Sequence, residues 1–319
     1  MSAKLATKIT ARKNNRVVKL RNPFVKRAKP LSWLLSGLWL MWALPTLAGD
    51  LTNPGEYVFK LAGCKSCHTD SEHQGDFMAG GRALATPFGT FYTPNITSDP
   101  EHGLGKWSEA EFIQVLSKGI SPGGSHYFPV FPYPSYTRMS REDMQALWAY
   151  LRTVSAVAKP NKAHDIPWYL GRIASWSWQY LFFTPGAWTP QPDKSIAWNR
   201  GAYIATALAH CGECHTPRNR FGVLDQSMAY AGTENGPEDA KVPNITSDPE
   251  TGIGKWSHDE LVDFFQEGML PDGDYTGSLM AEVVDNGLKY MTKADAEALA
   301  TYIAALPPIP HAIVHKKKN

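Results

Sequence analysis

Acidic residues are absent from residues 1–49, although this stretch holds ten Lys or Arg. The remaining residues contain 22 Lys or Arg against 30 Asp or Glu, so the rest of the chain has no excess of positive charge. A nucleic-acid-binding surface needs such an excess, and the composition therefore excludes nucleic acid as a partner. Strand-like alternation of apolar and polar residues is also scarce, so the sequence predicts a mostly α fold.

An uncharged apolar run follows the basic stretch. Residues 31–48 read "LSWLLSGLWLMWALPTLA", a length at the boundary between the core of a signal peptide and a membrane span. Basic residues ahead of such a run keep the N-terminal side in the cytoplasm, so we expect the chain after Asp50 to be exported to the periplasm. Residues 1–49 are therefore predicted to be a basic segment with either a cleaved signal peptide or an N-terminal anchor in the inner membrane.

The rest of the chain contains the same unit twice. Residues 94–112, "PNITSDPEHGLGKWSEAEF", and residues 243–261, "PNITSDPETGIGKWSHDEL", match at 14 of 19 positions, and each follows a CxxCH motif. A repeat on this scale is typical of a duplicated domain. The sequence predicts one unit at residues 50–155 and a second at residues 199–310, followed by a basic tail at residues 311–319.

Signals for the start of a helix recur at matching places in both units. Ser108 and Ser257 each stand three positions before a glutamate, which is the spacing of a capping box. Final helices are expected within residues 139–151, "MSREDMQALWAYL", and 291–303, "MTKADAEALATYI". Each unit is thus predicted to contain a helix, the CxxCH motif, a long loop, a middle helix, a second loop and a final helix.

The segment between the units, residues 156–198, is unlike either of them. A flexible linker is rich in Gly and Ser and polar, whereas this segment is rich in proline and aromatic residues. One interpretation is a strap that packs apolar rings against both units. The alternative is that part of it stays exposed and docks a membrane-bound partner. Its tryptophans are Trp168, Trp176, Trp178, Trp188 and Trp198.

Three chemistries compete for the two CxxCH motifs, which contain all four cysteines of the chain. A redox dithiol needs CxxC at the start of a helix in a βαβ setting, and neither motif has strands around it. A shared zinc site made by the four cysteines would leave both following histidines unused. Covalent haem uses every residue, because cysteines at i and i+3 form thioethers from one face of a helical turn and the histidine at i+4 binds iron. Two covalently bound haem c groups are therefore predicted, one on Cys64, Cys67 and His68 and one on Cys211, Cys214 and His215.

Each iron also needs a sixth ligand or an open position. A methionine thioether from the loop before the last helix blocks exogenous ligands and suits electron transfer. Met139 stands immediately before the final helix of the first unit and is the predicted metal ligand there, beside His68. In the second unit Met280 and Met291 compete: Met291 matches Met139 in the repeat, whereas Met280 lies earlier, in the predicted loop. The alternative for each of these methionines is ordinary core packing.

Four further side chains have a functional and a structural interpretation. His126 and His258 would give bis-histidine ligation, but each also fits a surface histidine. Arg82 and Arg218 lie in loops after the two CxxCH motifs, where they would pair with haem propionates or remain solvated. The sequence leaves these alternatives open.

The segments "FPYPSYTRMSREDMQALWAYL" and "FFTPGAW … WNRGAY … HCGECHTPRN" resemble the cytochrome c subunits of membrane-bound bacterial dehydrogenases. The resemblance is to those of quinoprotein alcohol dehydrogenases and molybdenum-containing aldehyde dehydrogenases, and it includes the aromatic segment between the units. It implies two tandem class I cytochrome c domains joined by an aromatic- and proline-rich strap. By motif position it implies axial methionines at Met139 and Met280, with Met291 as the alternative to Met280.

The same resemblance implies a dihaem c-type cytochrome that relays electrons in the periplasm. The donor would be the catalytic subunit of a dehydrogenase, and the acceptor quinone, a soluble cytochrome or an oxidase of the respiratory chain. Typical members carry three haems and a C-terminal membrane-contacting segment, whereas this chain has two CxxCH motifs, so we expect its membrane contact at the N-terminal apolar segment.

The alternative function is a dihaem redox enzyme, such as a cytochrome c peroxidase or a thiosulfate-oxidising cytochrome. Such an enzyme needs an iron that is open or has a displaceable ligand, and an acid–base residue over it. The sequence does not indicate that combination, so we expect no catalysis by this chain alone.

Overall fold

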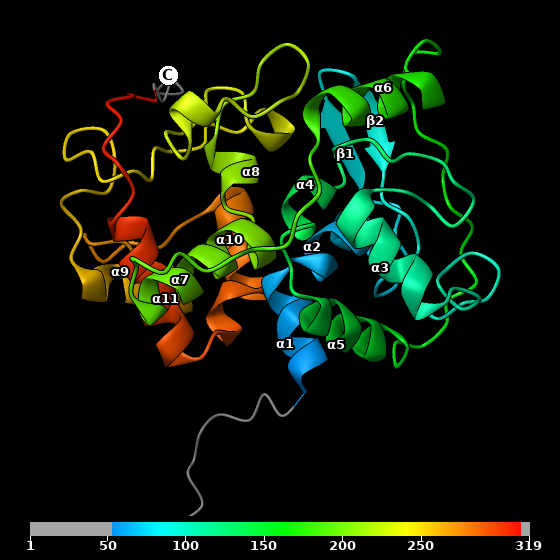
Figure 1. The fold of residues 1–319 in the computed structure, drawn as a ribbon, viewed down its shortest axis with the longest axis horizontal. Coiled ribbons are helices and arrows are strands. Elements are labelled where there is room, and N and C mark those ends of the chain that lie inside the picture. Colours follow the sequence, from blue (N-terminus) through cyan, green and yellow to red (C-terminus); the bar gives the residue numbers. More distant parts are fainter. Residues whose placement is uncertain (1–52, 314–319) are drawn as a thin grey trace, which may run out of the picture. The chain divides into compact units, whose positions relative to one another are not determined.

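Helices make up most of the secondary structure of residues 53–313, the part of the chain that the computed structural model describes (Figure 1). This confirms the predicted mostly α fold. Within these residues no helix is long and apolar enough to cross a bilayer. The predicted signal peptide or anchor at residues 31–48 lies outside the described residues.

The first repeat, residues 53–155, begins with a helix that leads into the first CxxCH motif. A β-hairpin follows, and three helices complete the repeat (Figure 1). Its elements are α1 (Pro54–Leu61), α2 (Cys64–His68), the 3-10 turn η1 (Ser71–His73), β1 (Ala83–Thr86), β2 (Gly89–Tyr92), α3 (Glu109–Lys118), α4 (Tyr133–Tyr136) and α5 (Arg141–Leu151).

The second repeat, residues 195–313, has its helices in the same order, and its first helix starts slightly before the predicted boundary at residue 199. Short turns occupy the place of the hairpin. Its elements are α7 (Ile196–Tyr203), the π-helical turn η2 (Ile204–Leu208), α8 (Gly212–His215), the 3-10 turns η3 (Gln226–Met228) and η4 (Pro237–Asp239), α9 (His258–Glu267), α10 (Ser278–Asn286), the 3-10 turn η5 (Leu288–Tyr290) and α11 (Lys293–Ala304).

Both middle helices begin with the predicted capping boxes. The Ser108 side chain accepts a hydrogen bond from the backbone N–H of Glu111 at 3.3 Å, and the Ser257 side chain accepts one from Glu260 at 3.2 Å. Each glutamate side chain reaches back to the backbone of its serine. Two donors at the helix start are thereby satisfied in each repeat, which fixes where α3 and α9 begin.

One extra residue distinguishes the second repeat before its CxxCH motif. The first repeat reads "GEYVFKLAGC" from its helix glycine to the first cysteine, and the second reads "GAYIATALAHC". The turn η2 lies in this segment, and a π-helical turn accommodates a single inserted residue within a helix. The residue before the first cysteine has a positive φ in both repeats, 64° at Gly63 and 38° at His210.

The first and last helices of each repeat pack so closely that only glycine fits between them. A Cβ atom added at Gly55 of α1 would lie 2.0 Å from the carbonyl oxygen of Ala146 on α5. A Cβ at Gly201 of α7 would lie 1.9 Å from the carbonyl oxygen of Ala298 on α11. Such contacts bring two helix backbones together without intervening side chains, so these glycines set the helix crossing in both repeats.

The segment before each final helix differs from the predicted loop. The structure places α4 in the first repeat and the longer α10 in the second. Met280 therefore lies in the first turn of a helix and not in a loop. The sequence suggested a loop because the turn-forming residues "PDGDYTG" immediately precede α10, and the helical pattern that starts at Ser278 is too short to stand out from them.

The connector, residues 156–194, contacts both repeats. Thr90 of β2 and Asp165 exchange two backbone hydrogen bonds, at 2.8 and 2.9 Å, so the connector adds to the edge of the hairpin. Its helix α6 (Arg172–Phe182) follows, and the Trp178 indole donates to the carbonyl oxygen of Phe221 in the second repeat at 2.8 Å. The connector is thus held at several points along its length.

Helix α6 buries two polar side chains and exposes several apolar ones. Ser175 and Gln179 are 1% and 7% exposed, whereas Ile173 and Tyr180 are 80% and 78% exposed. Trp176 stacks on Tyr180 with ring centroids 5.6 Å apart. This is the reverse of an ordinary surface helix. Part of the segment between the repeats is therefore exposed, as one of the two interpretations of the sequence expected. Docking of a partner on this surface stays a prediction.

Replacing Gly55 or Gly201 by alanine tests the close helix crossings. We expect Gly55→Ala and Gly201→Ala each to lower the free energy of unfolding by about 2 kcal/mol or more, because the added methyl forces the paired helices apart. Thermal unfolding of the full chain, followed by circular dichroism, measures this. The matched control is Gly123→Ala, since a Cβ there meets no atom within 4 Å. Equal melting temperatures in all three variants would contradict the packing argument.

Candidate haem sites

Each CxxCH motif forms a single helical turn. The first motif is helix α2, and the second is helix α8 with Cys211 at its N-cap. Side chains three and four positions apart share a face of such a turn. Each turn therefore presents its two thiols and its imidazole to the same side, which is the arrangement that covalent haem attachment requires.

Both motif histidines are oriented by the same hydrogen bond. The Nδ1 atom of His68 lies 2.8 Å from the carbonyl oxygen of Pro94, and Nδ1 of His215 lies 2.8 Å from that of Pro243. A carbonyl accepts only, so Nδ1–H is the donor and Nε2 keeps its lone pair. This second interaction of the ring is the one that fixes the tautomer of a metal-binding histidine.

The protonation state of the two histidines also suits iron ligation. Burial lowers the pKa of His68 and that of His215, and this effect outweighs the opposite influence of the hydrogen bonds to the proline carbonyls. Both rings are therefore neutral at neutral pH. A neutral imidazole is the form that binds a metal, so the residues present fit a haem iron on the Nε2 side.

The repeated "PNITSD" sequence forms the same buried turn directly after each of the two prolines. The Asn95 side-chain oxygen accepts hydrogen bonds from the N–H and the hydroxyl of Thr97 at 2.9 and 2.7 Å, and Asn244 accepts from Thr246 at the same two distances. All four side chains are buried. The repeat is visible in the sequence, but its link to the histidines follows only from the position of each proline carbonyl beside a motif imidazole.

The protein surroundings of all four cysteines favour the protonated thiol. Burial raises the pKa of Cys64 and of Cys211 to about 12, and it also raises that of Cys67. For Cys214 burial raises the pKa to about 11, and the charges of Glu213 and Cys67 contribute to the rise. Within residues 53–313, no group of three His, Cys, Asp or Glu is placed to hold a metal ion.

The three candidate methionines lie in different surroundings. Met139 follows α4 and is 1% exposed, and Met291 is 4% exposed directly before the cap of α11. Met280 is half-buried on α10 and packs against the core. Burial of Met139 and Met291 agrees both with ligation and with core packing. The assignment of Met139 and Met280 as axial ligands stays a prediction.

The remaining candidates have other partners. His126 contacts the side chain of Gln179 on α6, and His258 is exposed with its ring 3.2 Å from the carbonyl oxygen of Glu297. Arg218 pairs with Glu213, inside the second CxxCH motif, at 2.5 Å. The structure thus brings Arg218 to a motif by an ion pair.

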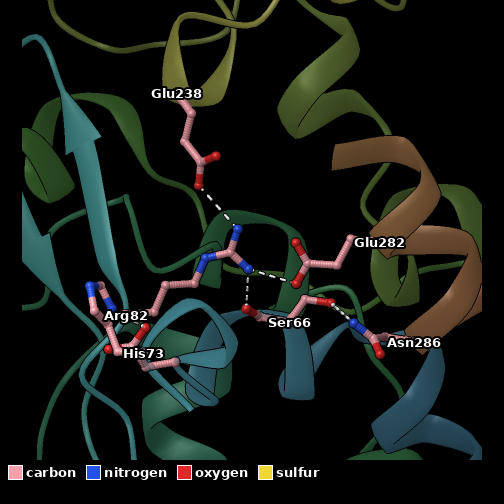
Figure 2. Close-up of polar contacts among 7 residues, drawn as sticks. Ser66, His73, Arg82, Glu238, Glu282 and Asn286 are labelled. Carbon is pink, nitrogen blue, oxygen red and sulfur yellow. Dashed lines mark hydrogen bonds and ion pairs between the residues drawn. The ribbon is translucent and has the colours of Figure 1, made fainter. Parts of the chain in front are cut away.

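Arg82 joins the first motif to the second repeat (Figure 2). Its guanidinium donates to the carbonyl oxygen of Ser66, within the first motif, at 2.5 Å and to Glu282 of α10 at 2.6 Å. A third bond reaches Glu238 at 3.1 Å. Burial opposes the charge of Arg82, but the two glutamates outweigh it and the pKa of the guanidinium is raised. Asn286 of α10 also donates to the Ser66 hydroxyl at 3.1 Å.

The second motif is contacted by the first repeat in return. Ser135 of α4 donates to Glu213 at 2.6 Å. Tyr136, also on α4, donates to the carbonyl oxygen of Ala62 at 2.8 Å and lies 3.3 Å from Nε2 of His210. Each CxxCH turn therefore contacts the helix that lies between the middle and the final helix of the other repeat. This helix is α10 for the first motif and α4 for the second. The two motifs are close enough for Cys67 to influence the pKa of Cys214.

Replacing Arg82 tests the ion pairs between the repeats. We expect Arg82→Gln to destabilise the chain by about 2 kcal/mol, since it leaves two partly buried glutamates without their shared cation. Chemical denaturation measures the change. The double variant Arg82→Gln/Glu282→Gln should recover part of the loss, because one unpaired charge is removed. If the double variant is as unstable as the sum of the single ones, the pairing is not a stabilising contact.

Removing the buried asparagines tests the support of the histidines. We expect Asn95→Ala and Asn244→Ala each to cost about 2 kcal/mol of stability, because buried donors lose their acceptor. In haem-loaded protein, Asn95→Ala should alter the spectrum of one haem and Asn244→Ala that of the other, as each loop holds one histidine. Redox titration followed by absorption distinguishes the two. An identical spectral change in both variants would contradict a separate role for each loop.

Comparison with known proteins gives a consistent set of relatives. A profile of the cytochrome c family matches residues 53–155. The chain is 37% identical to a diheme cytochrome c-type protein of Cereibacter sphaeroides, covering 86% of this chain and 94% of the relative. It is 38% identical to the cytochrome c subunit of a quinone alcohol dehydrogenase from Gluconacetobacter polyoxogenes, over 83% of this chain and 58% of that subunit.

A third relative is the fructose dehydrogenase cytochrome subunit of Gluconobacter japonicus, 36% identical over 79% of this chain and 52% of the subunit. The chain thus spans little more than half the length of these dehydrogenase subunits, whereas it spans almost all of the diheme protein. The sequence identity, the share of this chain that is matched and the paired CxxCH turns all indicate the same family. The chain belongs to the cytochrome c family, together with electron-transfer cytochrome subunits of bacterial dehydrogenases.

Proposed function

We propose that the chain is a dihaem c-type cytochrome in which each repeat is a class I cytochrome c domain that holds one covalent haem. The observation that carries this proposal is the pair of equivalent histidine-to-proline hydrogen bonds, both 2.8 Å long. A CxxCH turn occurs by chance in unrelated chains. Two turns with the same oriented, neutral imidazole indicate the same ligand function twice.

When bound, haem iron supplies a reversible one-electron couple. The residues of each turn have distinct tasks in this proposal. Cys64 and Cys67 would hold the first group by thioether bonds, and His68 would bind its iron. Cys211, Cys214 and His215 would do the same in the second repeat. Met139 and Met280 are proposed to complete the ligation, with Met291 as the alternative to Met280.

We further propose that the chain receives electrons from the catalytic subunit of a dehydrogenase. The support is that several relatives are named as cytochrome subunits of alcohol, fructose and gluconate dehydrogenases. The acceptor would be quinone, a soluble cytochrome or an oxidase. We place the protein in the periplasm, released or anchored through residues 31–48, because covalent haem attachment and the apolar run after a basic segment both fit export.

Counting haems in motif variants tests the proposal. Expressed in the periplasm with haem-maturation proteins, the full chain should carry two haems, and both Cys64→Ala/Cys67→Ala and Cys211→Ala/Cys214→Ala should carry one. The pyridine haemochrome assay against protein concentration gives the number. Absence of covalent haem from the unaltered chain would refute the assignment.

Carbon monoxide distinguishes electron transfer from catalysis by this chain. Methionine on the sixth position blocks exogenous ligands, so the reduced protein should keep its spectrum under carbon monoxide. A haem that binds carbon monoxide readily in the unaltered protein would favour a dihaem enzyme, such as a peroxidase, instead. Reduction of both haems by an added dehydrogenase and its substrate tests the relay itself.

A further inference from the structure

The two repeats are joined by two equivalent tyrosine contacts. Tyr203 of α7, in the second repeat, donates to the Asp143 carboxylate on α5 of the first. Tyr57 of α1, in the first repeat, donates to the Asp295 carboxylate on α11 of the second at 2.5 Å. Tyr57 and Tyr203 occupy matching places in the repeated helix sequence. The interface is therefore self-complementary, like that of a two-fold symmetric dimer.

Each tyrosine also holds the start of the other repeat's final helix. The backbone N–H of Ser140 donates to the Tyr203 hydroxyl at 3.0 Å, and that of Thr292 donates to the Tyr57 hydroxyl at 3.3 Å. Ser140 and Thr292 are the N-cap residues of α5 and α11. The residue immediately before Ser140 is Met139. A tyrosine of the second repeat thus fixes the backbone next to the proposed axial ligand of the first.

The connector holds the other side of the same methionine. The N–H of Gly186 donates to the Thr137 hydroxyl at 3.0 Å, and the N–H of Trp188 donates to the carbonyl oxygen of Arg138 at 2.9 Å. Met139 lies between these contacts and the Tyr203 contact, and it is 1% exposed. The backbone on both sides of Met139 is therefore tied to residues outside the first repeat.

We propose that Tyr203 is a positioning residue for the axial ligand of the first haem, acting across the interface between the repeats. This inference rests on the proposed function and adds that the first site is completed by the second repeat and the connector. The tyrosine hydroxyl accepts from Ser140 and donates to Asp143, so its loss frees two groups at the start of α5. The segment that carries Met139 would then be less restrained, and its thioether would hold a bound haem less firmly.

The test uses the full chain with both haems bound. Tyr203→Phe keeps the ring and removes the hydroxyl. We expect the fraction of reduced protein that binds carbon monoxide at one haem to rise about tenfold, a change equivalent to about 1.4 kcal/mol. The potential of that haem should fall, since it loses thioether ligation for part of the time. Melting temperature is measured alongside, and Asp143→Ala serves as a second variant that breaks the same contact.

Tyr57→Phe is the matched control. Arg200 donates to Asp295 twice, at 2.8 and 2.6 Å, so this carboxylate keeps a partner when the Tyr57 hydroxyl is removed. We expect a smaller effect, which falls on the second haem if its ligand is Met291, the residue before Thr292, and is absent if its ligand is Met280. A redox titration of each variant gives the potentials of both haems. The variant Cys211→Ala/Cys214→Ala, which should carry only the first haem, shows which of the two potentials belongs to that haem.

Met139→Ala separates the inference from the proposed function. This variant should open the first haem to carbon monoxide fully. If it does so and Tyr203→Phe and Asp143→Ala leave carbon monoxide binding and both potentials unchanged, the positioning role is overturned while the ligand assignment stands. If Met139→Ala has no effect on ligand binding in a protein with two haems, both the ligand assignment and the inference are wrong.

Discussion

The hydrogen bond from a motif histidine to a proline carbonyl is the interaction on which both sites depend. It selects the tautomer, leaves Nε2 with its lone pair and fixes the plane of the ring. The asparagine and threonine after each proline hydrogen-bond to each other in the interior, and we expect this to restrain the loop that carries the carbonyl. The conspicuous repeat "PNITSD" is thus a support for the histidines. It contributes no iron ligand of its own.

A second constraint acts between the repeats. The first CxxCH turn is linked to α10 of the second repeat through Arg82, and the second turn is linked to α4 of the first repeat through Ser135. Equivalent tyrosines cross the interface in both directions. Contacts of this kind arise when a duplicated domain keeps the interface of a symmetric pair. They place the two motifs near each other, which electron transfer between them would require.

The sequence predicted the first, middle and final helices of each repeat but not α4, α6, α10 or the hairpin of β1 and β2, and these misses have physical causes. The capping boxes at Ser108 and Ser257 fix the start of α3 and α9 by local hydrogen bonds, which sequence spacing reveals. Helix α10 was missed because the turn residues before it resemble a continuing loop. In helix α6 no sequence pattern indicates that Ser175 and Gln179 face inward. Their burial depends on which face of the helix packs against the rest of the protein.

The sequence alone indicated the type of chemistry, because two CxxCH motifs, a duplicated unit and the caps that begin its helices are local patterns of residue type and spacing. Only the tertiary structure decided which carbonyl each histidine binds and which repeat holds each final helix. The partners of His68 and Tyr203 are far away in the chain, and such contacts form only when the chain has folded. The segment around Met139 is an example of both. The sequence predicts that Met139 stands before a helix, whereas the residues that restrain this segment come from the connector and the second repeat.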